Sequence, residues 1–406
     1  MNSFTDELNR RLTALREQGL HRELRRVNSA QGPRIEIGGQ THLNFSSNDY
    51  LGLANHPSLK TAAVKAVEKY GAGAGASRLI CGSLAPFHEL EETLAAFKKT
   101  EAALTFATGY AAALGTLTAL VGKGDVVILD KLVHASIVDA AKLSGAKLRI
   151  FDHNDLNDLE DKLKWADQFS KAESAKRKAE ILVVTESIFS MDGDAAPLRE
   201  IVALKNKYDA WLMVDEAHAT GIFGKNGRGL ADELGVSSQI EIQMGTLGKA
   251  LGASGGYICG SRALIDFLVN RARSFIFSTA PVPAAAAAAT AGIQLLQTET
   301  GDQLRSKVWN LANLLEHSVQ ACGWNISAPD SLIMPMIIGD ESETLYLSKQ
   351  LREQNIFVPA IRFPTVARGA ARLRITLTAA HSAADVSELV AALARLKSET
   401  SHLESP

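Results

Sequence analysis

From about residue 57, segments with helical periodicity alternate with short apolar runs typical of buried β-strands. This alternation predicts an α/β fold in which helices cover both faces of a mostly parallel sheet. The predicted helices are 57–70, 86–99, 110–121, 134–144 and 197–207, and the predicted strands are 102–107, 125–129, 147–151, 181–185, 211–215, 240–244 and 256–260. A helix-rich final third with strands near 332–338, 356–360 and 372–376 indicates a smaller second domain.

Three regions are expected in the chain of 406 residues. Residues 1–56 form an N-terminal arm and a small segment, 57–290 a large domain, and 291–406 a C-terminal domain. Residues 4–26 mix leucines with many charges and predict an amphipathic helix outside the main core. The alanine run 284–289 favours a closely packed helix.

Composition narrows the classes of partner. The 43 Lys and Arg residues nearly balance the 45 Asp and Glu residues, and no segment collects the basic side chains that a nucleic-acid groove needs. The three cysteines form no C-x-x-C pair, so we expect a reducing compartment and no metal site.

The N-terminus lacks the apolar core of a signal peptide, which favours a cytoplasmic protein. The uncharged stretches 102–122 and 274–297 could span a membrane by length, but their Gly, Thr, Pro and Ala content favours buried core elements.

Two glycine-containing segments are candidates for binding a phosphate. The cluster 71–77 follows a predicted helix rather than a strand, so a flexible loop is favoured there over a dinucleotide site. Residues 105–110 instead run from a predicted strand through Gly109 into an alanine-rich helix. Free N–H groups and the dipole at a helix start attract phosphate, although any such turn can carry a glycine.

Asp215 and Lys249 are the candidate chemical groups. Asp215 ends a predicted strand, at the sheet edge where α/β proteins bind ligands. It is expected either to face a positive group of a ligand or to cap the next helix. Lys249 stands among Gly and Ala residues, where partial desolvation would lower the pKa of its amine and suit it to Schiff-base and proton-transfer chemistry. An ordinary surface lysine in a glycine loop is the alternative.

Together these residues match the parts of pyridoxal phosphate. The helix start at Gly109 would take the phosphate, Asp215 would keep the pyridine nitrogen protonated, and Lys249 would form the Schiff base. His134 could stack on the ring face, and His218 could reach the ring hydroxyl. The sequence therefore predicts pyridoxal phosphate as the cofactor.

Four segments resemble the α-oxoamine synthases, and the resemblance covers nearly the whole chain. The segments are 44–53 (NFSSNDYLGL), 187–194 (SIFSMDGD), 214–221 (VDEAHATG) and 245–249 (GTLGK). Members of this family are pyridoxal-phosphate enzymes of the aspartate-aminotransferase fold (fold type I), which join an amino acid to an acyl thioester with loss of carbon dioxide. Residues 360–366 (AIRFPTV) and 371–381 (ARLRITLTAAH) look most like the members of biotin biosynthesis.

The resemblance implies roles for individual residues. Lys249 is the Schiff-base lysine, Asp215 the pyridinium partner and His134 the stacking residue. Further cofactor-binding residues are Gly109, Tyr110 and Thr246 on the phosphate side, Ser190 and His218 at the phenolic oxygen, Glu186 nearby, and Thr279 from a neighbouring subunit, which implies a homodimer with shared active sites. The implied substrate-binding residues are Arg362 at the amino-acid carboxylate, Asn48, Ser77, and Arg22 of the N-terminal arm, with Arg25 as its alternative.

The implied substrates are L-alanine and a pimeloyl group carried by coenzyme A or by an acyl carrier protein. Ser77 stands where the glycine-using 5-aminolevulinate synthases commonly have Thr, and this difference favours alanine. A 5-aminolevulinate synthase or a glycine C-acetyltransferase stays open, because the same catalytic residues would serve. A non-catalytic partner subunit is disfavoured by Lys249, and an NAD-dependent dehydrogenase by the helix before Gly71.

Overall fold

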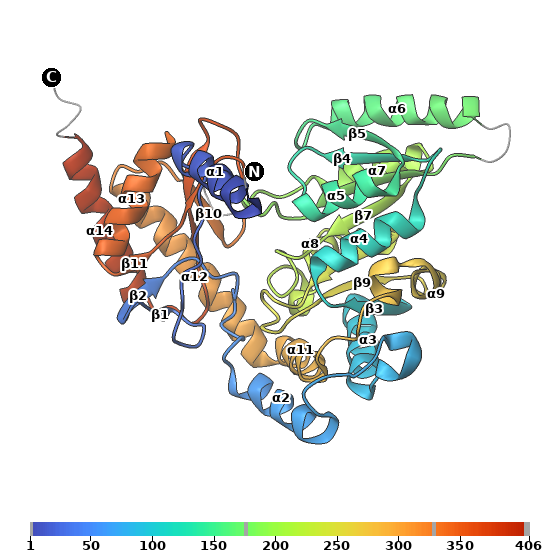
Figure 1. Cartoon of the computed structure of the whole chain (residues 1–406), viewed down its shortest axis with the longest axis horizontal. Coiled ribbons are helices and arrows are strands. Elements are labelled where there is room, and N and C mark those ends of the chain that lie inside the picture. The colour runs from blue at the N-terminus through green and yellow to red at the C-terminus, as the bar shows by residue number, and fades with distance from the viewer. Residues whose placement is uncertain (1–2, 174–177, 327–329, 402–406) are drawn as a thin grey trace.

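The computed structural model describes residues 3–173, 178–326 and 330–401. Figure 1 shows a large α/β region and a smaller region, in which the C-terminal third lies together with the N-terminal strands. Helix α12 (Glu299–Ala321) follows the last helix of the large region and leads into the smaller one.

A seven-stranded sheet forms the centre of the large region. In spatial order its strands are β3 (Ala102–Phe106), β9 (Gly256–Gly260), β8 (Ile242–Thr246), β7 (Trp211–Asp215), β6 (Ile181–Glu186), β4 (Val126–Asp130) and β5 (Lys147–Phe151). Strand β9 pairs antiparallel with both of its neighbours, and the other pairs are parallel. Every residue of β3, β4, β6 and β9 is buried, and their sequences are mainly apolar without polar alternation, as burial on both faces requires. The predicted α/β fold with a mostly parallel sheet is confirmed.

Helices pack on and around this sheet. They are α2 (Pro57–Tyr70), α3 (Ala85–Lys98), α4 (Gly109–Leu120), α5 (Ala135–Ser144), α6 (Leu156–Glu173), α7 (Leu198–Lys207), α8 (Leu230–Glu233), α9 (Arg262–Arg271), α10 (Arg273–Ile276) and α11 (Pro283–Leu296). The alanine run falls in α11, which packs against α2 and α3 and buries Ala286, Ala288 and Ala289. Small side chains let these helices approach closely, as the sequence predicts.

The smaller region holds two further sheets. One consists of β10 (Ile333–Gly339), β13 (Ala371–Thr376) and β12 (Ala360–Ile361), and the other of β1 (Arg34–Ile37), β2 (Gln40–Asn44) and β11 (Ile356–Phe357). Helices α12, α13 (Glu341–Glu353) and α14 (Ala383–Ser401) pack beside them. Strand β2 pairs in parallel with β11, so the N-terminal segment completes a sheet of the C-terminal third.

Some predicted elements differ from the structure. Helix α1 covers Phe4–Glu17 rather than 4–26, because Gly19 with a φ of 65° turns the chain after it. The predicted strand 240–244 lies two residues further on, as β8, and the predicted strand 356–360 divides into β11 and β12. Residues 78–82, for which no helix was predicted, form a π-helical turn. The domain boundaries stay a prediction, and α11 runs unbroken across residue 290.

The two stretches considered as membrane spans are ordinary core elements. The stretch 102–122 contains β3 and α4. The stretch 274–297 contains all of α10 except its first residue, and all of α11. Within the described part of the chain, no helix is long and apolar enough to cross a bilayer.

Candidate active site

The carboxyl ends of three neighbouring strands meet the start of α4 at one edge of the central sheet. Glu186 ends β6, Asp215 ends β7 and Thr246 ends β8. The strand register pairs Glu186 with Asp215, and Asp215 with Met244. Residues far apart in the sequence are thus held side by side, at the edge where parallel sheets bind ligands.

Helix α4 begins directly beside the end of β8. A Cβ atom at Gly109 would lie 2.5 Å from Cγ2 of Thr246, so only glycine permits this approach. Thr108 caps the helix, since its Oγ1 accepts a hydrogen bond from the N–H of Ala111 at 3.0 Å. The Oγ1 of Thr246 is buried and has no hydrogen-bond partner among the described residues. An unpartnered hydroxyl beside the free N–H groups of a helix start fits a phosphate.

Tyr110 lies in the first turn of α4 with its ring exposed. Its hydroxyl donates to Oδ2 of Asp139 on α5 at 2.6 Å. Because the hydroxyl is engaged with α5, the part of Tyr110 that suits a bound phosphate is its backbone N–H in the first turn of the helix.

Asp215 is buried, and its Oδ1 accepts a hydrogen bond from the N–H of Ala217 at 2.9 Å. Burial raises the pKa of Asp215, and the positive charge of Lys249 opposes that rise. The capping alternative is wrong, because a turn follows Asp215 and the next α-helix starts only at Leu230. A buried carboxylate at this position needs a cation opposite it, and a protonated pyridine nitrogen meets that need.

Lys249 lies in a polar chain with two buried side chains. Its Nζ is 2.7 Å from Nε2 of His218, and Nδ1 of His218 is 2.6 Å from the hydroxyl of Tyr50. Burial lowers the pKa of Lys249 to about 8, although the negative charges of Asp215 and Glu186 oppose the shift. Burial, together with the charge of Lys249, holds the pKa of His218 well below its usual value. Lys249 is therefore no ordinary surface lysine, and His218 is neutral at physiological pH.

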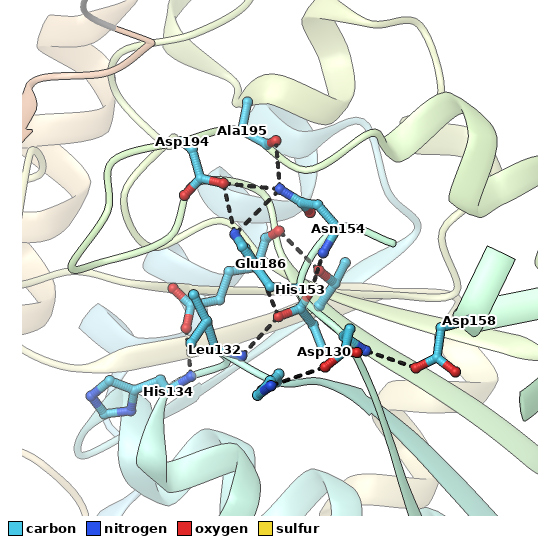
Figure 2. A network of polar contacts seen from close by, with 12 residues as sticks. Asp130, Leu132, His134, His153, Asn154, Asp158, Glu186, Asp194 and Ala195 are labelled. Carbon is cyan, nitrogen blue, oxygen red and sulfur yellow. Dashed lines mark hydrogen bonds and ion pairs between the residues drawn. The ribbon is translucent and has the colours of Figure 1, made fainter. Parts of the chain in front are cut away.

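His134 caps the start of α5 and is exposed, and its ring lies close enough to Asp215 and Lys249 for both charges to act on it. Its backbone N–H donates to Oε1 of Glu186 at 2.5 Å (Figure 2), and its Nδ1 is 2.8 Å from Oγ of Ser136. Burial and the charge of Asp215 raise the pKa of Glu186 to about 8. Glu186 thus fixes the backbone from which the His134 ring projects.

Arg374, on β13 of the smaller region, joins two of the predicted site residues. Its Nε donates to the carbonyl of Ser190 at 2.7 Å, and both of its terminal nitrogens lie 3.3 Å from Oδ1 of Asn48. Sequence reasoning did not single out Arg374 or Tyr50, although both lie within segments that resemble the α-oxoamine synthases. Their position in those segments was the sequence signal that could have identified them as site residues.

Arg362 follows β12 and is partly buried. In the described part of the chain, no carboxylate lies within ion-pair distance of the Arg362 guanidinium. A guanidinium that binds the carboxylate of a substrate needs this freedom. Arg22 reaches the same loop, with its Nη2 3.4 Å from Oγ1 of Thr365. Arg25 instead lies over the ring of Phe357, which favours Arg22 over Arg25 near Arg362.

Ser77 and Thr279 are brought together by an isolated antiparallel bridge, and the N–H of Ala280 donates to the carbonyl of Ala76 at 3.0 Å. Thr279 is exposed, and Ser77 is partly buried at the end of the glycine loop. The glycine loop 71–77 therefore follows helix α2 and runs beside the segment that carries Thr279, which does not resemble a dinucleotide-binding turn.

Comparison with known proteins agrees with this geometry. Residues 40–393 match the family described as aminotransferase class I and II. The chain belongs to that family. An 8-amino-7-oxononanoate synthase from Geobacter sulfurreducens is 48% identical over 388 residues, which cover 96% of this chain and 97% of the relative. This similarity places the chain in the α-oxoamine synthase branch of the family.

Solved structures support the same family. A serine palmitoyltransferase from S. paucimobilis with a bound PLP–myriocin aldimine is 30% identical, with a TM-score of 0.88 over 96% of each chain. An 8-amino-7-oxononanoate synthase from Francisella tularensis is 28% identical, with a TM-score of 0.73 over 88% of this chain and 99% of the other. The predicted fold type I is confirmed.

Pyridoxal phosphate is the cofactor of this family, and the residues present here fit it. The unpartnered hydroxyl of Thr246 beside the start of α4 suits the phosphate, the buried Asp215 suits the pyridine nitrogen, and Lys249 offers an amine of lowered pKa. The predicted cofactor is thereby confirmed.

Proposed function

We propose that the chain condenses L-alanine with a pimeloyl thioester and releases carbon dioxide and the free thiol, forming 8-amino-7-oxononanoate for biotin biosynthesis. The observation that carries this proposal is the near-complete alignment with an 8-amino-7-oxononanoate synthase at 48% identity. The arrangement of Lys249, His218 and Asp215 supports a catalytic chain over a non-catalytic partner subunit.

The reaction needs a base at the Cα atom of alanine and a means of holding its carboxylate. Pyridoxal phosphate, when bound, supplies an electron sink that stabilises negative charge on that Cα. Because burial lowers the pKa of Lys249 to about 8, about a tenth of this amine is neutral at pH 7, far more than of an ordinary lysine, so it can accept the Cα proton and later return one. His218 and Tyr50 orient this amine, and Arg362 binds the carboxylate.

The carbon–carbon bond then forms between the alanine Cα and the thioester carbonyl. The carbon–sulfur bond of the thioester breaks, and the sulfur leaves as the free thiol. The alanine carboxylate then leaves as carbon dioxide, and Cα is reprotonated. Asp215, by keeping a proton on the ring nitrogen, and His134, by packing against the ring, would hold the site ready for both stages. Ser77 leaves room for the alanine methyl group, an effect worth about 1–3 kcal/mol in discrimination.

A substrate panel tests the proposal against its nearest alternatives. Purified holoenzyme is assayed with alanine, glycine and serine, each against pimeloyl, acetyl and succinyl thioesters. We expect the highest kcat/KM for alanine with a pimeloyl thioester. A preference for glycine with an acetyl or a succinyl thioester would instead identify a glycine C-acetyltransferase or a 5-aminolevulinate synthase. Running the pimeloyl arm on coenzyme A and on acyl carrier protein determines the carrier.

Arg362→Lys should raise the KM for alanine, because lysine keeps the charge but loses the two-pronged geometry that a guanidinium offers a carboxylate. The expected loss in kcat/KM for alanine corresponds to about 1.5–3 kcal/mol of transition-state binding. The KM for the acyl thioester should change much less. Steady-state kinetics with both substrates varied measures this. Unchanged alanine kinetics with a lowered melting temperature would show that Arg362 is structural.

We propose that the protein is a homodimer whose active sites are shared through Thr279. The exposure of Thr279 supports a role at a subunit boundary. Mixing Lys249→Ala subunits with Thr279→Ala subunits should regenerate one intact site in each heterodimer, so the activity of the mixture should exceed that of either parent. If verified subunit exchange leaves the activity of the mixture no higher than that of the parents, the active sites are not shared through Thr279.

The cytoplasmic location stays a prediction.

A further inference from the structure

His153 lies outside the set of residues described above, yet it joins two loops that enter the site. It follows β5, and each ring nitrogen faces a different carboxylate (Figure 2). Nδ1 is 2.9 Å from Oδ1 of Asp130, and Nε2 is 2.7 Å from Oδ2 of Asp194. The ring also meets the ring of Phe189 edge-on, with 4.3 Å between centroids.

Both ring nitrogens of His153 face oxygen atoms that only accept hydrogen bonds, so both carry a proton. Burial opposes the resulting charge, but the hydrogen bonds and negative charges of Asp130 and Asp194 outweigh it and raise the pKa of His153 to about 10. His153 is therefore a cation with two charge-assisted bonds at neutral pH, a stronger link than a neutral imidazole would provide.

The first of these bonds leads to His134. Asp130 ends β4 with a fully buried side chain, and besides His153 it accepts the backbone N–H groups of Leu132 at 2.8 Å and Asn154 at 3.0 Å. Two residues after Leu132, the N–H of His134 reaches Glu186. Asp130 thus sets the path of the loop that ends in the His134 ring.

The second bond leads to the turn that contains Ser190. Asp194 closes this turn, because its carbonyl accepts the N–H of Phe189 at 3.0 Å, and its side chain also accepts from Nδ2 of Asn154 at 2.9 Å. From the smaller region, Arg374 binds the carbonyl of Ser190. The turn is therefore held between His153 on one side and the strand β13 on the other.

We propose that His153 is a positioning residue that fixes His134 and Ser190 relative to each other through Asp130 and Asp194. The proposal rests on the cofactor-facing roles given to His134 and Ser190 under the proposed function. An uncharged side chain at this position would release one or both loops, and displacements of about 1 Å at such positions can cost up to about 100-fold in rate.

The test compares His153→Gln with Lys205→Gln in the holoenzyme. Lys205 is also a buried cation in an ion pair, with Glu241 near the opposite end of the sheet, so it controls for the loss of a buried charge. The measurements are the visible circular dichroism of the bound cofactor, the melting temperature, kcat and both KM values. Each substitution is also made in a His134→Ala background, since residues that act through one another are not additive.

We expect His153→Gln to alter the visible circular dichroism and to lower kcat about tenfold, with the KM for the thioester within about twofold of wild type. In the His134→Ala background its effect on kcat should shrink to about threefold or less. Lys205→Gln should change only the melting temperature. An unaltered dichroism spectrum, or an equal fold-loss in both backgrounds, would overturn the proposal.

If His153→Gln does not fold, Asp194→Asn decides the matter, because the Asp194 side chain is about one-third exposed and the amide keeps its shape. An altered dichroism spectrum with a several-fold lower kcat supports the proposal, and a wild-type spectrum and rate overturn it. The spectrum reports on the cofactor without any substrate, so a wrong substrate assignment would leave this result intact and would show only in the substrate panel.

Discussion

Lys249→Ala should abolish turnover while leaving the fold intact. The substitution removes the group that bonds covalently to the cofactor and the base at Cα together, so we expect kcat to fall at least about 10⁴-fold. The fold should survive, because burial already disfavours the charged form of this amine, and its removal relieves a desolvation cost. Cofactor should still bind through the start of α4 and Asp215.

Three measurements check this result. Borohydride reduction followed by peptide mass spectrometry should find the cofactor on the peptide of residue 249 in the wild type and nowhere in the variant. Thermal melting tests the fold, and steady-state assays give the rate. Lys164→Ala, on the exposed face of α6, is the matched control and should behave as wild type. A folded Lys249→Ala protein with near-normal turnover would refute the assignment.

Asp215→Asn should bind the cofactor but lose most activity. A neutral amide has nearly the same shape as the carboxylate, yet it does not hold the pyridine nitrogen protonated, so the ring withdraws less charge from Cα. Removing one electrostatic group of this kind typically costs on the order of 10²–10³-fold in kcat. Asp215→Glu keeps the charge on a longer side chain and should recover part of the loss.

The rates of both Asp215 variants are compared at saturating cofactor, so that weaker binding is not mistaken for slower chemistry. Asp161→Asn, an exposed carboxylate on α6, serves as the control for the loss of one negative charge. A normal rate in Asp215→Asn would mean that another group protonates the ring nitrogen, with Glu186 as the nearest candidate on the neighbouring strand.

Local patterns predicted much of the site. Gly109 starts a helix after a strand, Asp215 ends a strand, and Lys249 lies in the loop that follows one, and such positions can be recognised within ten residues of sequence. The continuous apolar strands were recognisable for the same reason, since burial on both faces leaves no polar alternation. The residues that Gly109, Asp215 and Lys249 contact could not be predicted from the sequence around them.

The missed features depend on distant pairing. Tyr50 acquires its role from contact with His218, and Arg374 from contact with Ser190 and Asn48, across separations that no local pattern encodes. Strands β1 and β2 were missed because their sequences, RIEI and QTHLN, lack the apolar runs of the core strands, although the Gly38–Gly39 pair between them, with φ of 60° and 78°, is a strong hairpin signal.

The pairing of β2 with β11 has a consequence for how the protein is made. The N-terminal strand leaves the ribosome long before its partner, because more than 300 residues separate Asn44 from Phe357, with which it pairs. Until Ile356 and Phe357 are synthesised, one edge of β2 carries unpaired N–H and C=O groups, and such edges promote association with other chains. The nascent chain must therefore keep this edge from other strands throughout most of its synthesis.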